Sequence, residues 1–248
     1  MTVVKHNILN DIAVIEISNP PVNAISAAVR IELLETVNKL SVEKNIKAVV
    51  ITAPERTFLA GADIKEFGKD IDAPNLSEIC DKIENLDKIV VASLHGTPLG
   101  GGLEVAMSAH YRIAAPKTKV GLPEVLLGIL PGAGGTQRLP RLCGVSMALD
   151  MMLTGKHVPA EEAFANGIID EIAPNDKTVE NGISYAQKLI SEKFEVRPTS
   201  KITSKVNNLE EIKEIITNAK ANALKKYKNL FSPHNIIKSV EEGLNLDF

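Results

Sequence analysis

The sequence predicts an α/β fold over residues 1–190, built on a mixed or parallel sheet, followed by a helical C-terminal region over residues 191–248. Three short β-branched runs support the sheet, because nearly continuous apolar segments suit strands that are buried on both faces. These runs are Ala13–Ile17, Ala48–Thr52 and Ile89–Leu94. After Gly134 the strand patterns largely vanish and helical patterns follow, which predicts the change in architecture.

The first predicted helix covers residues 26–40, where four apolar residues fall on one helical stripe and Ser26 is placed to cap it. Further short strands are expected at Tyr111–Ala115 and Val120–Leu122, with a turn at Pro116-Lys117 between them. Later helices are expected at about 134–142, 145–154, 159–166, 178–191, 209–229 and 233–243. Gly155 and Gly167 stand where C-terminal caps are expected, and the stretch 197–204 is the expected joint between the two regions.

The composition excludes several classes of protein. The net charge is −3 and the pI is near 6.0, so no global field attracts nucleic acid or an acidic membrane. Three Tyr, six Phe and no Trp argue against an aromatic platform for single-stranded nucleic acid. Cys80 and Cys143 are far apart in sequence and are expected to be unpaired thiols in a reducing compartment.

Targeting and membrane signals are also missing. The start at 1–10 has no apolar run of signal-peptide length, and apolar stretches such as 89–92 are far shorter than a membrane span. The final Leu-Asp-Phe is not an address such as Ser-Lys-Leu. A soluble, cytoplasmic protein is therefore expected.

Residues 60–64, Ala-Gly-Ala-Asp-Ile, follow the predicted strand at 48–52 and precede a short helical pattern. Asp63 suits the N-cap of that helix, which leaves the backbone around Ala62 in a turn. Small side chains let a ligand approach the main chain closely, and turn amides can point outward as donors. Taken alone, the segment fits an ordinary capped turn as well as a ligand-binding turn.

Residues 99–104, Leu-Gly-Gly-Gly-Leu-Glu, place three glycines between the strand at 89–94 and a helical run at 103–109. A glycine-lined helix N-terminus offers free amides, and its dipole favours a developing negative charge. Neither a Walker loop nor the Gly-x-Gly-x-x-Gly spacing is present, which weakens a nucleotide-binding interpretation. Glu104 either sits on a surface turn near the dipole or is buried for a functional reason.

Residues 121–124, Gly-Leu-Pro-Glu, bring a second carboxylate into an apolar stretch. Glu104 and Glu124 facing one pocket would push their pKa values apart, which suits an acid and a base. The glycine-rich residues 131–138 follow and indicate another helix entry. Taken alone, these residues also fit a loop and a helix cap.

Taken together, these segments resemble the crotonase (enoyl-CoA hydratase/isomerase) superfamily over at least residues 10–190. The likeness rests on motifs in family order: Asn19-Pro20, Val22-Asn23-Ala24, AGADI at 60–64, LGGGLE at 99–104, GLPE at 121–124 and PGAGGTQRLPR at 131–141. Within the superfamily the chain looks most like the N-terminal hydratase part of multifunctional β-oxidation enzymes, in which a 3-hydroxyacyl-CoA dehydrogenase follows on the same chain.

The resemblance implies a superhelix of repeated ββα units with a helical C-terminal region, and two backbone amides that hold a thioester carbonyl. By motif position the amides belong to Ala62 and Gly101, and the two catalytic glutamates are Glu104 and Glu124. It also implies acyl-CoA contacts from the first segment, at Ala60, Gly61, Asp63 and Ile64. Because CoA is part of the substrate, no separate cofactor and no metal are expected.

The implied reaction is hydration of 2-enoyl-CoA thioesters to 3-hydroxyacyl-CoA in fatty-acid β-oxidation, with Glu104 activating water and Glu124 protonating C2. The nearest alternative is a 3,2-enoyl-CoA isomerase on the same oxyanion hole. A non-catalytic acyl-CoA-binding scaffold is the alternative from another class, and the presence of both glutamates speaks against it. The expected association is a homotrimer or hexamer, or a partner 3-hydroxyacyl-CoA dehydrogenase.

The C-terminal part departs from the family pattern. Many stand-alone members end with Glu-Gly-x-x-Ala-Phe-x-x-Lys-Arg, whereas residues 232–248 resemble the segment that leads into the dehydrogenase half of multifunctional enzymes. The chain is accordingly expected to be a truncated form, a split-gene product or a free-standing relative. Lys225 and Lys226 are expected on a solvated helix face rather than at a CoA phosphate. Three apolar residues are expected either to line an acyl pocket or to join the core: Leu126, Leu127 and Ile129.

Overall fold

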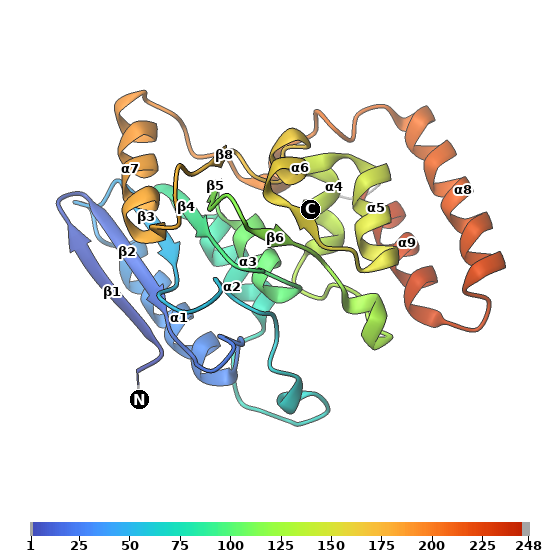
Figure 1. The fold of residues 1–248 in the computed structure, drawn as a ribbon, viewed down its shortest axis with the longest axis horizontal. Helices are drawn as coiled ribbons and strands as arrows, with labels where there is room; N and C mark the ends of the chain where they lie inside the picture. The colour runs from blue at the N-terminus through green and yellow to red at the C-terminus, as the bar shows by residue number, and fades with distance from the viewer. Residues whose placement is uncertain (1, 245–248) are drawn as a thin grey trace.

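The computed structural model describes residues 2–244 and centres on a six-stranded sheet of order β1-β2-β3-β4-β5-β8 (Figure 1). The first two strands form an antiparallel hairpin, and each later neighbour in the sheet is parallel. Parallel neighbours need crossover connections, which the helices between them provide. The strands are β1 (Val4–Leu9), β2 (Ile12–Ile17), β3 (Ala48–Thr52), β4 (Ile89–Leu94), β5 (Tyr111–Ala114) and β8 (Glu171–Ile172).

The register of the sheet separates two apolar layers. Val14, Val50, Val91 and Tyr111 lie opposite one another across four strands, and all four pack beneath helix α7 (Thr178–Ser191). Because side chains alternate along a strand, the intervening residues face the other side. That side is covered by α1 (Ala27–Ser41), α2 (Leu76–Glu84) and α3 (Gly101–Ser108). The inner strands β2 to β5 are therefore buried on both faces, as their nearly continuous apolar runs predict.

A second group of helices follows α3 and continues the same apolar core. Helix α9 packs on α4 and α5, and α8 packs on α5 and α9. In Figure 1 these helices lie beside the sheet rather than on it. The group comprises α4 (Gly135–Cys143), α5 (Val145–Thr154), α6 (Ala160–Ala165), α8 (Leu209–Lys226) and α9 (Phe231–Gly243), with a two-stranded sheet of β6 (Lys119–Val120) and β7 (Val158–Pro159).

Most predicted elements are confirmed, some with the same ends. The strands at 48–52 and 89–94 and the helices at 145–154 and 178–191 match residue for residue, and the Ser26 hydroxyl accepts from Val29 N as the predicted cap of α1. Gly155 ends α5 in the left-handed region at φ +68°. The predicted helix at 209–229 ends earlier, at Lys226. The division at residue 190 stays a prediction.

Besides two short 3₁₀ helices, four elements were missing from the sequence prediction. β1 carries Lys5, His6 and Asn7 in its middle, and only Val4 is buried, so it lacks the continuous apolar run of the inner strands. α2 is a short helix whose cap residue, Asn75, makes no side-chain hydrogen bond. β7 and β8 are two residues long each. Such short pairings form because neighbouring backbone is already in place, so no local pattern indicates them.

Other predictions concern single residues and the chain's end. Cys80 and Cys143 are buried free thiols, as predicted, and burial raises the pKa of each to about 12. Lys225 and Lys226 are exposed near the end of α8, which confirms the solvated helix face. In the described part of the chain, no helix combines the length and apolar character needed to cross a bilayer. The predicted segment 232–248 extends past residue 244, and its last four residues lie outside the described part.

Candidate active site

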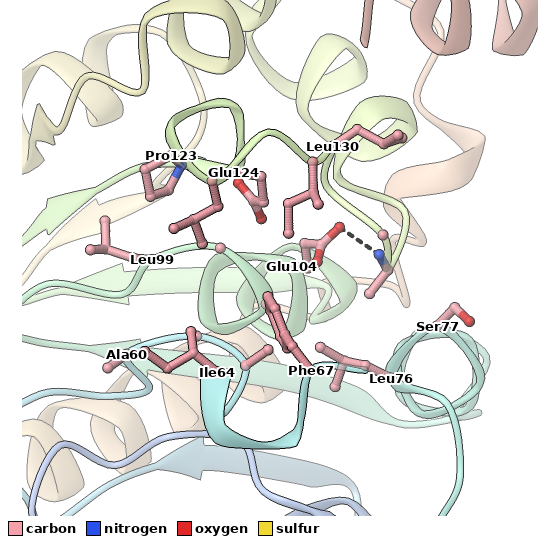
Figure 2. Close-up of a pocket in the computed structure, with 18 of the residues that line it drawn as sticks. Ala60, Ile64, Phe67, Leu76, Ser77, Leu99, Glu104, Pro123, Glu124 and Leu130 are labelled. Atoms are coloured by element: carbon pink, nitrogen blue, oxygen red, sulfur yellow. Dashed lines mark hydrogen bonds between the residues drawn. The ribbon is translucent and has the colours of Figure 1, made fainter. Parts of the chain in front are cut away.

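A cavity of about 460 Å³ is lined by the loops that follow the carboxyl ends of β3 and β4 and by the segment 123–133. Figure 2 shows Glu104 and Glu124 projecting into it, with Ile64, Phe67 and Leu76 on the opposite side. The cavity thus has a carboxylate side and an apolar side. Its lining residues are Ala60, Gly61, Ala62, Ile64, Phe67, Asn75, Leu76, Ser77, Leu99, Gly100, Gly101, Glu104, Pro123, Glu124, Leu127, Ile129, Leu130, Gly132 and Ala133.

The turn at 60–63 is held by a strand-like pairing with Ile25. Ile25 N donates to Gly61 O at 2.8 Å, and Asp63 N donates to Ile25 O at 3.3 Å. The peptide between them is left outside the pairing, so the Ala62 amide has no hydrogen-bond acceptor among the described residues. A donor that faces the cavity without a partner is available to a ligand.

The three glycines at 100–102 are each needed for a different reason. Gly100 adopts φ +52° and ψ −127° before α3 begins, a conformation that glycine reaches without strain. A Cβ on Gly102 would lie 2.1 Å from Leu59 O, so α3 could not approach the preceding loop with any larger residue. At Gly101 a Cβ would lie 2.7 Å from Leu76 Cδ2, inside the cavity.

The amides of Ala62 and Gly101 form one donor pair. A Cβ on Gly101 would stand 3.7 Å from Ala62 N, which places the two backbones side by side. Gly101 is the first residue of α3, so its N–H is one of the unpaired amides of a helix N-terminus. The two donors and the dipole end of α3 suit an oxygen atom that gains negative charge.

Glu104 is buried in the first turn of α3, with 2% of its surface exposed. Its Oε1 accepts from Ala133 N at 2.7 Å and from Gly135 N at 2.8 Å. Burial raises the pKa of Glu104, while the two amides and the charge of Arg138 lower it. The amides hold one carboxylate oxygen in place and leave the other for the cavity.

Glu124 begins the 3₁₀ helix η2 (Glu124–Leu127) and is 8% exposed. Its Oε2 is buried and has no hydrogen-bond partner among the described residues. Burial first, and the nearby Glu104 carboxylate second, raise the pKa of Glu124 to about 8. At neutral pH Glu124 therefore carries a proton. Glu104 accepts hydrogen bonds from two backbone N–H groups, which favour its ionised form, so the pair holds an acid beside a base.

The remaining predicted residues divide between the cavity and its surroundings. Ala60, Gly61 and Ile64 line the cavity. Asp63 does not line it: its Oδ1 accepts from Lys65 N and caps the 3₁₀ helix η1 (Ile64–Glu66). Of the three apolar residues considered for the pocket, Leu127 and Ile129 line the cavity and Leu126 does not. All three are exposed, so a role in the core is wrong for them.

Several lining residues were missing from the sequence prediction. Phe67, which directly follows η1, and Leu76 of α2 line the cavity and lie outside the motifs found in the sequence. Ala133 and Gly135 belong to the glycine-rich stretch that was interpreted only as a helix entry. Unpaired amides are expected at such an entry, so this stretch held a signal for the anchor of Glu104. The other lining residues without a predicted role are Asn75, Ser77, Leu99, Gly100, Pro123, Leu130 and Gly132.

Replacing Glu124 with Gln is expected to stabilise the fold at alkaline pH. The folded-state pKa of Glu124 is about 8, above its ordinary 4.5, so the wild type loses stability as pH rises from the lower value through the higher one. The loss approaches roughly 5 kcal/mol above pH 8, because each unit of pKa difference is worth about 1.4 kcal/mol. Denaturant unfolding of wild type and Glu124→Gln at pH 4.5 and pH 9 checks this. Equal free energies of unfolding of the two proteins at pH 9 would contradict a buried Glu124 carboxyl with a raised pKa.

The arrangement agrees with the relatives of the chain. Residues 7–244 match the enoyl-CoA hydratase/isomerase family. The peroxisomal bifunctional enzyme of Danio rerio is 44% identical over 193 residues, which are 78% of this chain and 27% of that protein. The glyoxysomal fatty acid beta-oxidation multifunctional protein MFP-a of Cucumis sativus is 38% identical over 94% of this chain and 33% of that protein. The chain spans about a third or less of these relatives.

Solved structures support the same fold. An enoyl-CoA hydratase from Bacillus anthracis is 26% identical with a TM-score of 0.70, over 98% of this chain and 90% of that chain. An enoyl-CoA hydratase from Mycobacterium tuberculosis H37Rv is 24% identical with a TM-score of 0.71, over 98% and 89%; it shows the fold alone. The predicted crotonase-like fold is confirmed. By its matched residues and its fold, the chain belongs to the enoyl-CoA hydratase/isomerase family.

Proposed function

We propose that this chain is an enoyl-CoA hydratase, which adds water across the 2,3 double bond of 2-enoyl-CoA thioesters in fatty-acid β-oxidation. One observation carries the proposal: two buried carboxylates and two unpaired amides line the same cavity. The names of the curated relatives and of the B. anthracis structure support it. A scaffold that only binds acyl-CoA has no need for two carboxylates kept from water, which cost stability.

The amides of Ala62 and Gly101 would bind the thioester oxygen. Addition of water to C3 moves electron density onto that oxygen, so donors placed there stabilise the transition state more than the ground state. Both donors are backbone groups fixed by pairing with Ile25 and by the start of α3. No reorganisation is needed when the charge develops.

Glu104 would act as the base and Glu124 as the acid. A water bound by the free oxygen of Glu104 gives one proton to that carboxylate while its hydroxyl bonds to C3 and the double bond breaks. Glu124 gives its proton to C2, and the proton taken by Glu104 replaces it before the next turnover. The sum is the addition of one water molecule.

The direct test follows the loss of the conjugated enoyl-thioester absorbance with 2-enoyl-CoA substrates from crotonyl-CoA upward in chain length. Loss of absorbance with water addition is expected. A 3-enoyl-CoA substrate separates 3,2-isomerisation from hydration, because isomerisation would produce the conjugated absorbance instead of removing it. Binding of acyl-CoA without any turnover would overturn the proposal in favour of a scaffold.

The value of kcat/KM is expected to pass through a maximum and to fall at both lower and higher pH. Glu124 must be protonated, and its pKa is about 8, so activity falls as pH rises through that value. Glu104 must be ionised, so activity falls as pH drops through its raised pKa. Initial rates at low crotonyl-CoA concentration between pH 5 and pH 10 measure both limbs. A rate that stays constant above pH 9 would exclude Glu124 as the acid.

The product would next be oxidised by a 3-hydroxyacyl-CoA dehydrogenase, the partner that the sequence resemblance implies. This partner, the trimeric or hexameric association and the cytoplasmic location remain predictions. The names of two relatives describe those proteins as peroxisomal and glyoxysomal. The location predicted from the sequence of this chain is cytoplasmic.

A further inference from the structure

Arg138 of α4 lies next to the active site, 1% exposed, and joins three parts of the chain. Its Nη2 donates to Glu84 Oε2 and Asp81 Oδ1, each at 2.8 Å, and its Nε donates to Glu84 Oε1 at 3.4 Å. Its Nη1 donates to Ala133 O at 3.0 Å. A guanidinium bound through several atoms has one orientation, so Arg138 ties Ala133 to the end of α2.

Ala133 is the point where this network meets the catalytic carboxylate. Its carbonyl accepts from Arg138, while its own amide donates to Glu104 Oε1 at 2.7 Å. Two residues later, Gly135 N donates to the same oxygen at 2.8 Å. Arg138 therefore holds the segment 133–135 through the Ala133 carbonyl, and the amides of this segment hold Glu104.

Glu84, the buried carboxylate partner of Arg138, is itself held by several hydrogen bonds. Glu84 is 2% exposed, and its Oε1 also accepts from Ser200 N at 2.8 Å. His110 Nε2 donates to the Glu84 carbonyl at 2.9 Å, while His110 Nδ1 accepts from Val90 N. These contacts come from β4, from the start of β5 and from the segment after α7, so the network rests on the main core.

We propose that Arg138 is a positioning residue for hydration, which sets the orientation of Glu104 by holding the two amides that bind its Oε1. This inference rests on the proposed role of Glu104 as the base. Arg138 does not line the cavity and acts through Ala133 and Gly135, without touching the substrate.

The charge of Arg138 adds a signature that geometry alone would not produce. Three groups face Glu104 from neighbouring elements: Glu124 of η2 across the cavity, Cys80 of α2 and Arg138 of α4. Burial holds Cys80 neutral with a pKa of about 12. Since Arg138 lowers the pKa of Glu104, its removal raises that pKa and moves the acid limb of kcat/KM to higher pH.

The test uses Arg138→Met and Arg138→Lys in the full chain with crotonyl-CoA. Arg138→Met is expected to lower kcat about tenfold or more, with KM within about twofold, and to move the acid limb up by about one pH unit. Arg138→Lys keeps the cation but loses the planar fork. Its acid limb is expected to stay near that of the wild type while its kcat remains reduced.

Arg112→Met is the matched control. Arg112 is also a fully buried arginine, paired with Asp170 at 3.1 Å and bound to Ala109 O and Ile168 O, outside the cavity. It is expected to lower the free energy of unfolding as Arg138→Met does, yet to leave kcat and the acid limb unchanged below its melting temperature. Equal acid limbs and equal kcat in Arg138→Met and wild type would overturn the proposal.

A readout that needs no turnover separates this inference from the proposed function. In protein carrying ¹³C in glutamate carboxyls, the Glu104 signal is assigned by its absence in Glu104→Gln, and its titration midpoint is expected to rise in Arg138→Met. In Arg138→Lys the amides of Ala133 and Gly135 are expected to exchange with solvent faster than in wild type. A shifted midpoint together with faster amide exchange in a chain that hydrates nothing would reject the hydratase and keep the placement of Glu104 by Arg138. An unchanged midpoint together with unchanged exchange would reject the positioning role in an active enzyme.

Discussion

Replacing Glu104 with Gln is expected to lower kcat for hydration of crotonyl-CoA by roughly 10²–10⁴-fold, the usual range for loss of a general base. The amide oxygen of Gln can still accept from Ala133 N and Gly135 N, so the segment that binds Oε1 keeps its partners. What is lost is the group that takes a proton from water. Because binding of the thioester by backbone amides is untouched, KM is expected to change little.

The matched control for this variant is Glu32→Gln. Glu32 also accepts two backbone amides, from Val3 and Val4 at 2.8 and 2.9 Å, but it lies on α1 away from the cavity. It is expected to hydrate crotonyl-CoA at the wild-type rate. Initial rates and urea unfolding of both variants measure activity and stability side by side. Near wild-type turnover in a folded Glu104→Gln would remove Glu104 from the mechanism, and the same holds for Glu124→Gln.

Replacing Gly101 with Ala is expected to lower kcat/KM for crotonyl-CoA by roughly 10²–10³-fold, the range measured when an oxyanion-hole donor is lost. The added Cβ would lie 2.7 Å from Leu76 Cδ2 and 3.7 Å from Ala62 N. A methyl group there stands beside both donors, where the thioester oxygen must bind. The clash is with the flexible end of a side chain rather than with backbone, so the variant is expected to fold.

Two further variants show whether the methyl group blocks the donors or acts through Leu76. Gly132→Ala places a Cβ on another residue of the same cavity, where it meets no atom within 4 Å, and it is expected to keep the wild-type kcat/KM. Leu76→Ala combined with Gly101→Ala gives the methyl group room and is expected to stay inactive. Recovery of activity in the double variant would assign the loss to displacement of Leu76 and would leave the oxyanion hole without support.

The inner strands and most helices follow from local pattern because each of them buries its own apolar stripe or run. The strand at 48–52 is buried at every residue, and α5 is bounded by glycines at both ends. α2 was missing from the prediction although it also carries an apolar stripe, with Ile79, Cys80 and Ile83 buried, and its nine residues form a helix with difficulty on their own. It forms against α1 and α3, and two of the unpredicted lining residues, Leu76 and Ser77, arrive with it.

Within the site, the residues predicted from short motifs reach the cavity where the backbone itself lines it. Ala62 and Gly101 lie in short motifs of small residues, and both backbones stand beside the cavity. Asp63 lies in the same motif but turns toward Lys65 N as a cap, a use that the sequence had also indicated. One motif therefore contains both a residue that lines the cavity and a structural cap, and the pairing with Ile25 holds the turn that carries them.

By itself, the sequence determined the α/β fold, the family and the four groups that meet at the cavity, because a local motif of small, apolar or acidic residues indicates each of them. Only the tertiary structure decided what those groups can do. It places Ala133 and Gly135 on one oxygen of Glu104, leaves Oε2 of Glu124 without a partner, and sets Arg138 behind the first of these carboxylates. The pKa values of the two glutamates depend on burial and on neighbours that are distant in sequence, so only the folded chain distinguishes the proposed acid from the proposed base.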